Sequence, residues 1–304
     1  MRIGIDPKVD FAFKVTFGSP EHPAITIHFL NAVLRLPAPI TQVEILNPVQ
    51  GRDRADDKLV VLDVLARDSS GRIFNIEMQT TLPAGMAQRL TFYNCQNYVR
   101  QFREGDHYHG LNPAISICVL NRVMWRQVGA YHLSFRLRCD QADLVFTDGL
   151  QFHTLELPKF LMPGTEIAQC SGLEKWLYFL MNAEFADPTE LLALLGDPIF
   201  EEALGVLQMI SRTPEERQYY DARQKFLLDE EARLLGARSE GLEQGIQQGR
   251  REGIEQGMLA GKIQLLQQLL GESASETPEL TSHSVAELTA LLQQLQERLR
   301  QRDT

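Results

Sequence analysis

Two carboxylates, Asp63 and Glu77, lie within apolar runs at a spacing that could form a metal site. The runs cover residues 58–66 and 73–80, and the turn-forming residues between them predict a β-hairpin. If the turn centres on Ser70, residues 63 and 77 face each other across the hairpin with Cβ atoms about 4.5 to 5.5 Å apart. Two carboxylates that close repel each other and resist burial, and a divalent cation such as Mg²⁺ relieves both penalties. The hairpin therefore predicts a Mg²⁺ site, with a solvated pair of acids as the alternative.

Residues around the hairpin could assist such a site. Asn75 and Gln79 share a strand face with Glu77, because side chains two residues apart point to the same side of a strand. Arg89 and Tyr93 lie four residues apart in a predicted helix, so both can point toward one anionic group. This arrangement favours chemistry on a phosphate.

Three other clusters give weaker signals. Asp10 and Lys14 also lie four residues apart, which taken alone indicates an exposed ion pair. Residues 107–109 read His-Tyr-His, but no third His or Cys lies near them, so a loop is preferred to a metal site. Acidic residues alternate with the basic ones over residues 52–58, so this run offers little net attraction for DNA phosphates.

Hydrophobic periodicity places the hairpin in an α/β domain over about residues 1–160. Apolar spacings of three and four predict helical segments over residues 8–36 and 86–103. Further strands are expected at residues 114–120, 133–137, 144–146 and 152–157. After residue 163 only helices are expected, and three of them should begin where a capping residue precedes proline, at Asp187, Asp197 and Thr213.

The C-terminal tail contains a glycine at every fourth position from Gly241 to Gly261. Six glycines would destabilise a lone helix by roughly 5 kcal/mol relative to alanine. The favoured interpretation is a helix whose glycine stripe lets another backbone approach closely, with a right-handed crossing; a flexible linker is the alternative. Ser284 and Glu287 form a capping box before a helix with a leucine face, which needs a partner in the same chain or in a second copy.

The composition excludes a disordered, a collagen-like and an entirely coiled-coil protein. The chain has 304 residues with 44% hydrophobic and 23% charged residues, as expected for a globular protein. Residues 1–150 hold 16 Lys and Arg against 15 Asp and Glu, whereas residues 151–304 hold 14 against 25. No apolar run is long enough to span a membrane, and the charged start predicts no signal peptide, so we expect a cytoplasmic protein. The four cysteines form no CxxC motif and are expected to be reduced.

Several separated motifs resemble a known family. Asp63 followed by Glu77-Met78-Gln79 is similar to the core of the PD-(D/E)XK nucleases. More narrowly, the chain resembles the Rpn family of recombination-promoting nucleases and transposases over residues 1–182, and its glycine repeat resembles theirs. The motifs that carry this resemblance are Asp10-Phe-Ala-Phe-Lys14-x-x-Phe17-Gly18, Asp63-Val64, Ile76-Glu77-Met78-Gln79, Arg89-x-x-x-Tyr93, Gly105-x-x-Tyr108, Leu155-Glu156-Leu157-Pro158-Lys159-Phe160 and Trp176-Leu-x-Phe179-Leu180.

The resemblance implies a metal-dependent DNA endonuclease with a restriction-endonuclease-like fold, a mixed sheet core flanked by helices. Asp63 and Glu77 would be metal ligands, the backbone carbonyl of Met78 a third ligand, and Asp10 an acid near the metal. The metal would be Mg²⁺, with Mn²⁺ or Ca²⁺ as alternatives.

One position departs from the pattern of the wider superfamily. Gln79 stands where the superfamily has a lysine that positions the attacking water and offsets phosphate charge. A neutral amide can only hydrogen-bond, so Arg89, with Tyr93 beside it, would supply the missing positive charge.

These inferences give one expectation for the whole chain and two alternatives. A nuclease-like domain would cover residues 1–182, a helical extension 183–235, and a self-associating pair of helices 236–304. The expected partners are DNA, in recombination or transposition, and further copies of the chain. The first alternative is a nuclease-like module that binds DNA or protein without cutting, and the second is an assembly protein in which the tail matters and the hairpin is vestigial.

Overall fold

The computed structural model describes residues 2–46, 49–50, 60–61, 64–105, 107–162 and 164–302. The chain forms two compact units, Met1–Asp229 and Glu230–Thr304. Several residues named above, including Asp63 and the charged run 52–58, lie outside the described residues.

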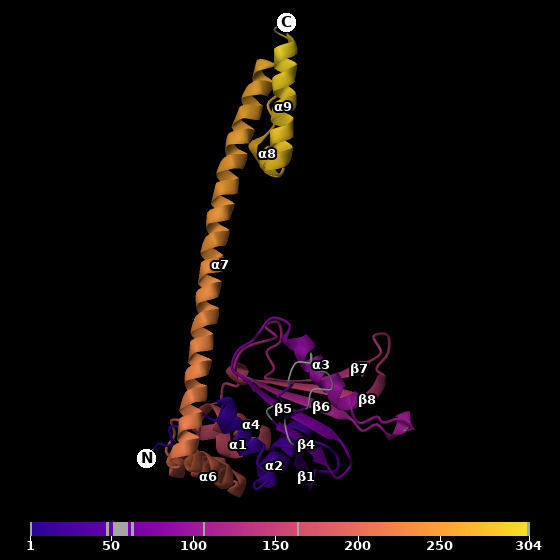
Figure 1. Cartoon of the computed structure of the whole chain (residues 1–304), viewed down its shortest axis with the longest axis vertical. Helices are drawn as coiled ribbons and strands as arrows, with labels where there is room; N and C mark the ends of the chain where they lie inside the picture. Colours follow the sequence, from indigo (N-terminus) through magenta and orange to yellow (C-terminus); the bar gives the residue numbers. More distant parts are fainter. Residues whose placement is uncertain are drawn as a thin grey trace. The chain divides into compact units, whose positions relative to one another are not determined.

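A six-stranded mixed sheet organises the first unit (Figure 1). Its strands, in spatial order, are β1 (Val43–Leu46), β4 (Val64–Asp68), β5 (Ile73–Gln79), β6 (Ala114–Leu120), β8 (Val145–Glu156) and β7 (His132–Arg138). The central strands β5, β6 and β8 pair in parallel, while the outer pairings are antiparallel. A separate short pair joins β2 (Val49–Gln50) to β3 (Val60–Val61). The predicted mixed sheet flanked by helices is confirmed.

Helices cover the two faces of the sheet unequally. One face carries Phe74, Ile76 and Met78 of β5, which share a hydrophobic core with the helices on that side. Those helices are α1 (Asp10–Phe17), α2 (Pro23–Leu34), α4 (Gly172–Asn182), α5 (Pro188–Leu195) and α6 (Pro198–Arg212). The other face carries Cys118 and Phe152, which pack with α3 (Met86–Val99). Polar residues of β5 can therefore reach the α3 face while its apolar residues fill the main core.

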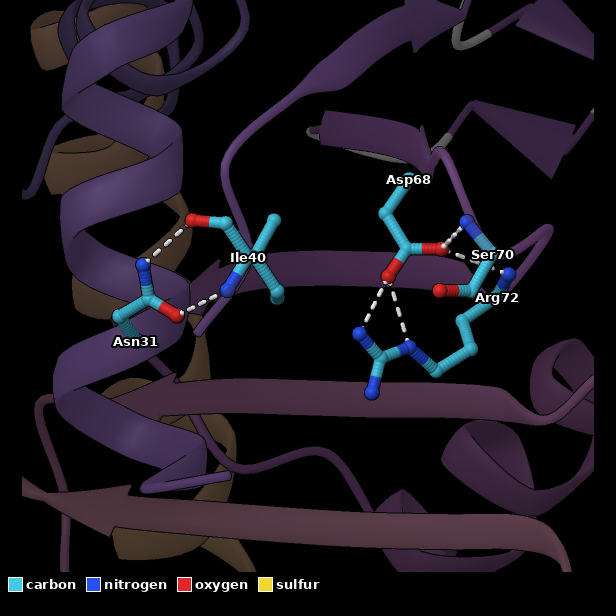
Figure 2. Close-up of polar contacts among 5 residues, drawn as sticks. All are labelled: Asn31, Ile40, Asp68, Ser70 and Arg72. Carbon is cyan, nitrogen blue, oxygen red and sulfur yellow. Dashed lines mark hydrogen bonds and ion pairs between the residues drawn. The ribbon is translucent and has the colours of Figure 1, made fainter. Parts of the chain in front are cut away.

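The β4–β5 hairpin is fixed by its turn (Figure 2). Asp68 accepts hydrogen bonds from the backbone N–H groups of Ser70 and Arg72, both at 3.0 Å, and its other oxygen binds the Arg72 guanidinium at 2.6 Å. The strands then pair Val64 with Ile76 and Leu65 with Asn75. This register is the one predicted from a turn centred on Ser70.

Three other expected elements differ from the structure in their bounds or in their number. The helical segment 8–36 divides into α1 and α2, and Asn31 of α2 holds the chain before β1 by binding both backbone groups of Ile40 (Figure 2). The helix expected over 86–103 ends at Val99. The prediction of separate strands at 144–146 and 152–157 was wrong, because β8 continues through polar residues and accommodates an irregular register with β7.

Short 3₁₀ turns and helix caps complete the first unit. The 3₁₀ turns are Tyr108–Gly110, Leu157–Lys159 and Gly164–Gln169. Asp187 and Asp197 cap α5 and α6 as predicted, each accepting a backbone N–H at 3.0 Å. The helix α7 (Pro214–Leu269) begins after Thr213, and its early residue Tyr220 is fully buried in the first unit.

In the second unit, α7 continues through the glycine repeat and is followed by α8 (Thr277–Thr281) and α9 (Val285–Arg302). The predicted helix over the glycines is confirmed, and so is the capping box, since Glu287 accepts the backbone N–H of Ser284 at 2.8 Å. Leu288, Leu292 and Leu295 of α9 pack with the end of α7, so the leucine face has a partner in the same chain. Among the described residues, no helix is long and apolar enough to cross a membrane.

Candidate active site

Glu77 is a buried carboxylate on the α3 face of the sheet. It lies in β5 with only 2% of its surface exposed, between Asn75 and Gln79 on the same strand face. The Asn75 amide donates to Glu77 Oε1 at 2.8 Å, and the Gln79 amide donates to Oε2 at 3.3 Å. The period of two along a strand therefore supplies one amide donor to each carboxylate oxygen.

Burial sets the electrostatics of this carboxylate. Removal from water raises the pKa of Glu77, and the Asn75 amide, the Arg89 guanidinium and the Gln79 amide oppose that rise without cancelling it. A buried carboxylate in this state gains from any further positive charge nearby. A cation beside Glu77 would therefore favour its charged form.

The positive charge of Arg89 in α3 acts on Glu77 and lowers its pKa. Its guanidinium carbon lies 5.5 Å from the centre of the Tyr93 ring, so the two residues predicted to share a helix face do meet. Tyr93 packs against Leu65 and Ile73 of the hairpin. The ring therefore anchors α3 to the hairpin and supports the arginine beside the carboxylate.

The oxygen atoms of Glu77 and Asn75 are of the kind that binds a hard divalent cation. Asn75 is fully buried, and its Oδ1 has no hydrogen-bond partner among the described residues. Carboxylate and amide oxygens are the ligands that Mg²⁺ and Ca²⁺ prefer. Within the described ranges no three His, Cys, Asp or Glu side chains gather as a metal cluster, and the predicted second carboxylate, Asp63, lies outside those ranges.

The contacts of the other predicted residues, Asp10 and Met78, do not include Glu77 among those that the structure describes. Asp10 begins α1 and binds the guanidinium of Arg223 in α7, with Nε at 3.1 Å from Oδ1. Met78 follows Glu77, and its side chain packs in the main core on the opposite face of the sheet. The roles predicted for Asp10 and for the Met78 carbonyl stay predictions.

The His-Tyr-His segment lies in an exposed turn. The rings of His107 and His109 stack with centres 5.4 Å apart, and Tyr108 stacks on Phe102 at 4.9 Å. These contacts are those of a surface turn, the interpretation preferred from the sequence.

A buried ion pair was missed by reasoning from residue spacing and appeared only within a family motif. Glu156 at the end of β8 is fully buried and lies 3.0 Å from Lys159 Nζ. Glu156 also accepts the backbone N–H of Met124 at 2.9 Å, and Lys159 donates to the Trp125 carbonyl at 2.8 Å. The sequence signal for this pair was an acid and a lysine three residues apart at the end of a strand. That spacing could not predict the contacts of the pair with the segment before β7.

Comparison with known proteins gives one result. A family model described as PD-(D/E)XK nuclease family transposase matches residues 7–237. No curated protein and no solved structure gives a significant match.

Proposed function

The chain belongs to the PD-(D/E)XK nuclease transposase family, as its motifs predicted, and from that premise we propose that it is a metal-dependent DNA endonuclease. The observation that carries the proposal is Glu77, a buried carboxylate held by two amide donors beside an arginine. The proposed substrate is a DNA phosphodiester bond cleaved during recombination or transposition.

In this proposal Glu77 and Asp63 hold the cation, Mg²⁺ in the first instance. The β4–β5 register supports the pairing, because the described pairs follow the same turn-centred register that would set residue 63 opposite residue 77. When bound, the cation would activate water and offset the charge of the phosphate. The Met78 carbonyl is the proposed third ligand, and Asp10 the acid of the first helix.

The remaining side chains act on the substrate. Gln79 hydrogen-bonds Glu77 and, as the residue in the position of the superfamily lysine, would orient the water or a phosphate oxygen. Arg89 would attract the scissile phosphate, because a guanidinium presents several donors to anionic oxygens. Tyr93 would keep that guanidinium in place.

Gln79 also favours a second candidate function. Without a lysine at that position the chain could bind DNA or a partner protein in the nuclease-like fold and cut weakly or not at all. The two candidates differ in whether the site binds metal.

Calorimetric titration of Mg²⁺ and Mn²⁺ into the full chain separates them. We expect one or two sites in the native protein and loss of binding in Asp63→Ala and Glu77→Gln. Glu166→Gln, which changes an exposed acid outside the sheet, is the matched control and should bind as the native chain does. A folded native protein without metal binding would favour the module that does not cut.

A further inference from the structure

A small cavity lies on the α3 face of the sheet, beyond Glu77. It has a volume of about 190 Å³ and lies between α3, the segment after β6, and strands β7 and β8. The residues that line it include Ala87, Leu90, Trp125, Phe135, Phe152 and Thr154.

Strand register relates the cavity to the candidate active site. Glu77 pairs with Cys118 across β5 and β6, and Cys118 pairs with Thr154 across β6 and β8. Directly paired residues share a sheet face, and neighbouring strands lie about 4.8 Å apart, so Thr154 lies roughly 10 Å from Glu77 along one row. A short single-stranded segment of nucleic acid can span that separation.

The walls of the cavity suit a flat aromatic ligand. The rings of Trp125 and Phe135 lie 5.5 Å apart at an angle of 43°, and 36% of the Phe135 surface is exposed. The volume falls below the range of about 300 to 1,000 Å³ for pockets that hold drug-sized ligands. One ring system, rather than an extended molecule, therefore fits.

Two of the residues that line the cavity carry a buried polar group. The Trp125 indole N–H and the Thr154 hydroxyl are both buried, and neither has a hydrogen-bond partner among the residues that the structure describes. Thr154 as a whole is only 2% exposed. An indole N–H can only donate whereas a hydroxyl can donate and accept, so a ligand edge that reached both groups would need acceptors and donors. Nucleobases have this combination of flat faces and polar edges.

The wall that carries Trp125 is held in place before any ligand binds. The buried Glu156–Lys159 pair binds backbone groups on both sides of the Met124–Trp125 peptide bond. At the start of the same segment, the Asn121 N–H donates to the Gln79 carbonyl at 2.9 Å. The candidate active site and the cavity wall are therefore tied to each other through the backbone.

We propose that this cavity holds one unpaired nucleobase of the DNA whose phosphate lies at Glu77. The proposal rests on the nuclease function proposed above and adds a substrate class, single-stranded or locally unpaired DNA. A base inside a duplex is stacked between its neighbours and must leave the stack before it can enter such a pocket. Stacking on aromatic side chains tolerates all four bases, so little sequence preference is expected.

Equilibrium binding of DNA in buffer that contains a chelator tests the pocket separately from cleavage. The probes are a fluorescein-labelled oligodeoxythymidylate, the same length of abasic strand, and a duplex of the same length, followed by anisotropy. We expect the thymidylate strand to bind the native chain at least about tenfold more tightly than the abasic strand, given the energy of base–aromatic stacking. The duplex should bind more weakly than the thymidylate strand.

Variants locate that preference in the cavity. Ala87→Phe should fill the space, and Trp125→Phe and Thr154→Val each remove one polar group, so all three should reduce the preference for bases over abasic sugar. Thr16→Val is the matched control, because Thr16 is also buried with an unpartnered hydroxyl but lies in α1 on the other side of the sheet. Circular dichroism and thermal unfolding check that each variant is folded.

The outcomes distinguish the pocket from the nuclease activity. Equal binding of the thymidylate and abasic strands by the native chain, or an undiminished preference in folded Ala87→Phe, would overturn the pocket even if the protein cuts DNA. A preference that Ala87→Phe removes and Glu77→Gln retains supports the pocket even if no cleavage is found.

Discussion

The carboxylate of Glu77 owes its properties to its immediate neighbours in β5. Burial disfavours its charge, and Asn75, Arg89 and Gln79 partly restore it, so the residue is sensitive to each of these partners. Two of the partners are neutral amides in the same strand, which fix the orientation of the carboxylate without adding charge. Any positive charge that stabilises the Glu77 carboxylate must therefore come from outside β5.

Arg89 supplies positive charge that acts on Glu77 from outside β5. Arg89→Gln should lower the rate of DNA cleavage at least about tenfold, since removal of one positioned donor to a reacting oxyanion commonly has a larger effect. Arg89→Lys should recover part of the rate, because it keeps the charge and loses the fork of donors. Steady-state cleavage rates measure both variants.

The matched control for Arg89 is Arg138→Gln, which changes an exposed arginine on the edge strand β7. It should cleave DNA at the native rate. Full activity in Arg89→Gln would remove this residue from the mechanism.

The two histidines of β7 and β8 predict a dependence of stability on pH. His153 Nδ1 lies 3.0 Å from His132 Nε2, and burial, with smaller effects of His132 and Arg136, lowers the pKa of His153 to about 4. A histidine with a lowered pKa stabilises the fold above its unfolded pKa of 6.5, and this contribution disappears as the pH falls toward 4. The decrease should be at most about 3 kcal/mol.

Urea denaturation at pH 7 and pH 4.5 measures this effect. The His153→Gln variant should lose a smaller part of its unfolding free energy between these two values than the native chain loses. Equal losses in both proteins would show that His153 does not carry the dependence.

At the scale of elements, the β4–β5 turn positions the candidate site. Gly71 adopts φ of +85°, and a Cβ at this residue would lie 2.6 Å from the Asn112 side-chain nitrogen. Gly71→Ala should therefore lower the unfolding free energy by roughly 1 to 3 kcal/mol through backbone strain, with the contact adding to it. It should also reduce cleavage, because the turn sets the hairpin register.

Gly105→Ala separates the effect of backbone strain from the effect of the contact with Asn112. Gly105 also has a positive φ, of +91°, but a Cβ there would meet no described atom within 4 Å. Chemical denaturation should find Gly71→Ala the less stable of the two variants, and the reverse order would contradict the role given to Asn112.

The hairpin shows what the sequence could predict and where prediction stopped. The register followed from turn residues alone, because the arithmetic of a tight turn leaves few alternatives. The continuity of β8 did not follow, since Thr147, Asp148 and Gly149 interrupt its apolar pattern and pairing with β7 continues the strand across this region. The cavity beside Trp125 could not be predicted, because its walls come from four separate segments that only the packed fold brings together.

At the scale of the whole molecule, the second unit raises the question of self-association. A Cβ built at each glycine of the repeat, from Gly241 to Gly261, meets nothing within 4 Å among the described residues. Within the described part of the chain, the glycines are thus not used for close packing, although each lowers helix stability by about 0.8 to 1 kcal/mol relative to alanine. We therefore propose that the stripe packs against a second copy.

Alanine at Gly245, Gly249 and Gly253 tests this proposal. The triple variant should be more resistant to thermal unfolding of its helix but should self-associate at least about tenfold more weakly, because added methyl groups keep the backbones apart. Sedimentation equilibrium measures the association. Gly236→Ala, outside the four-residue repeat, is the control, and equally strong association of the triple variant would contradict the proposal.

The central claim is that Glu77 and Asp63 together support metal-dependent DNA cleavage. The most direct test is nicking and linearisation of supercoiled plasmid by the purified full chain, with Mg²⁺, with Mn²⁺ and with chelator, alongside Asp63→Ala and Glu77→Ala. We expect cleavage by the native chain only when metal is present, and no cleavage by either variant at equal concentration. Cleavage that persists in folded Glu77→Ala, or in chelator, would contradict it.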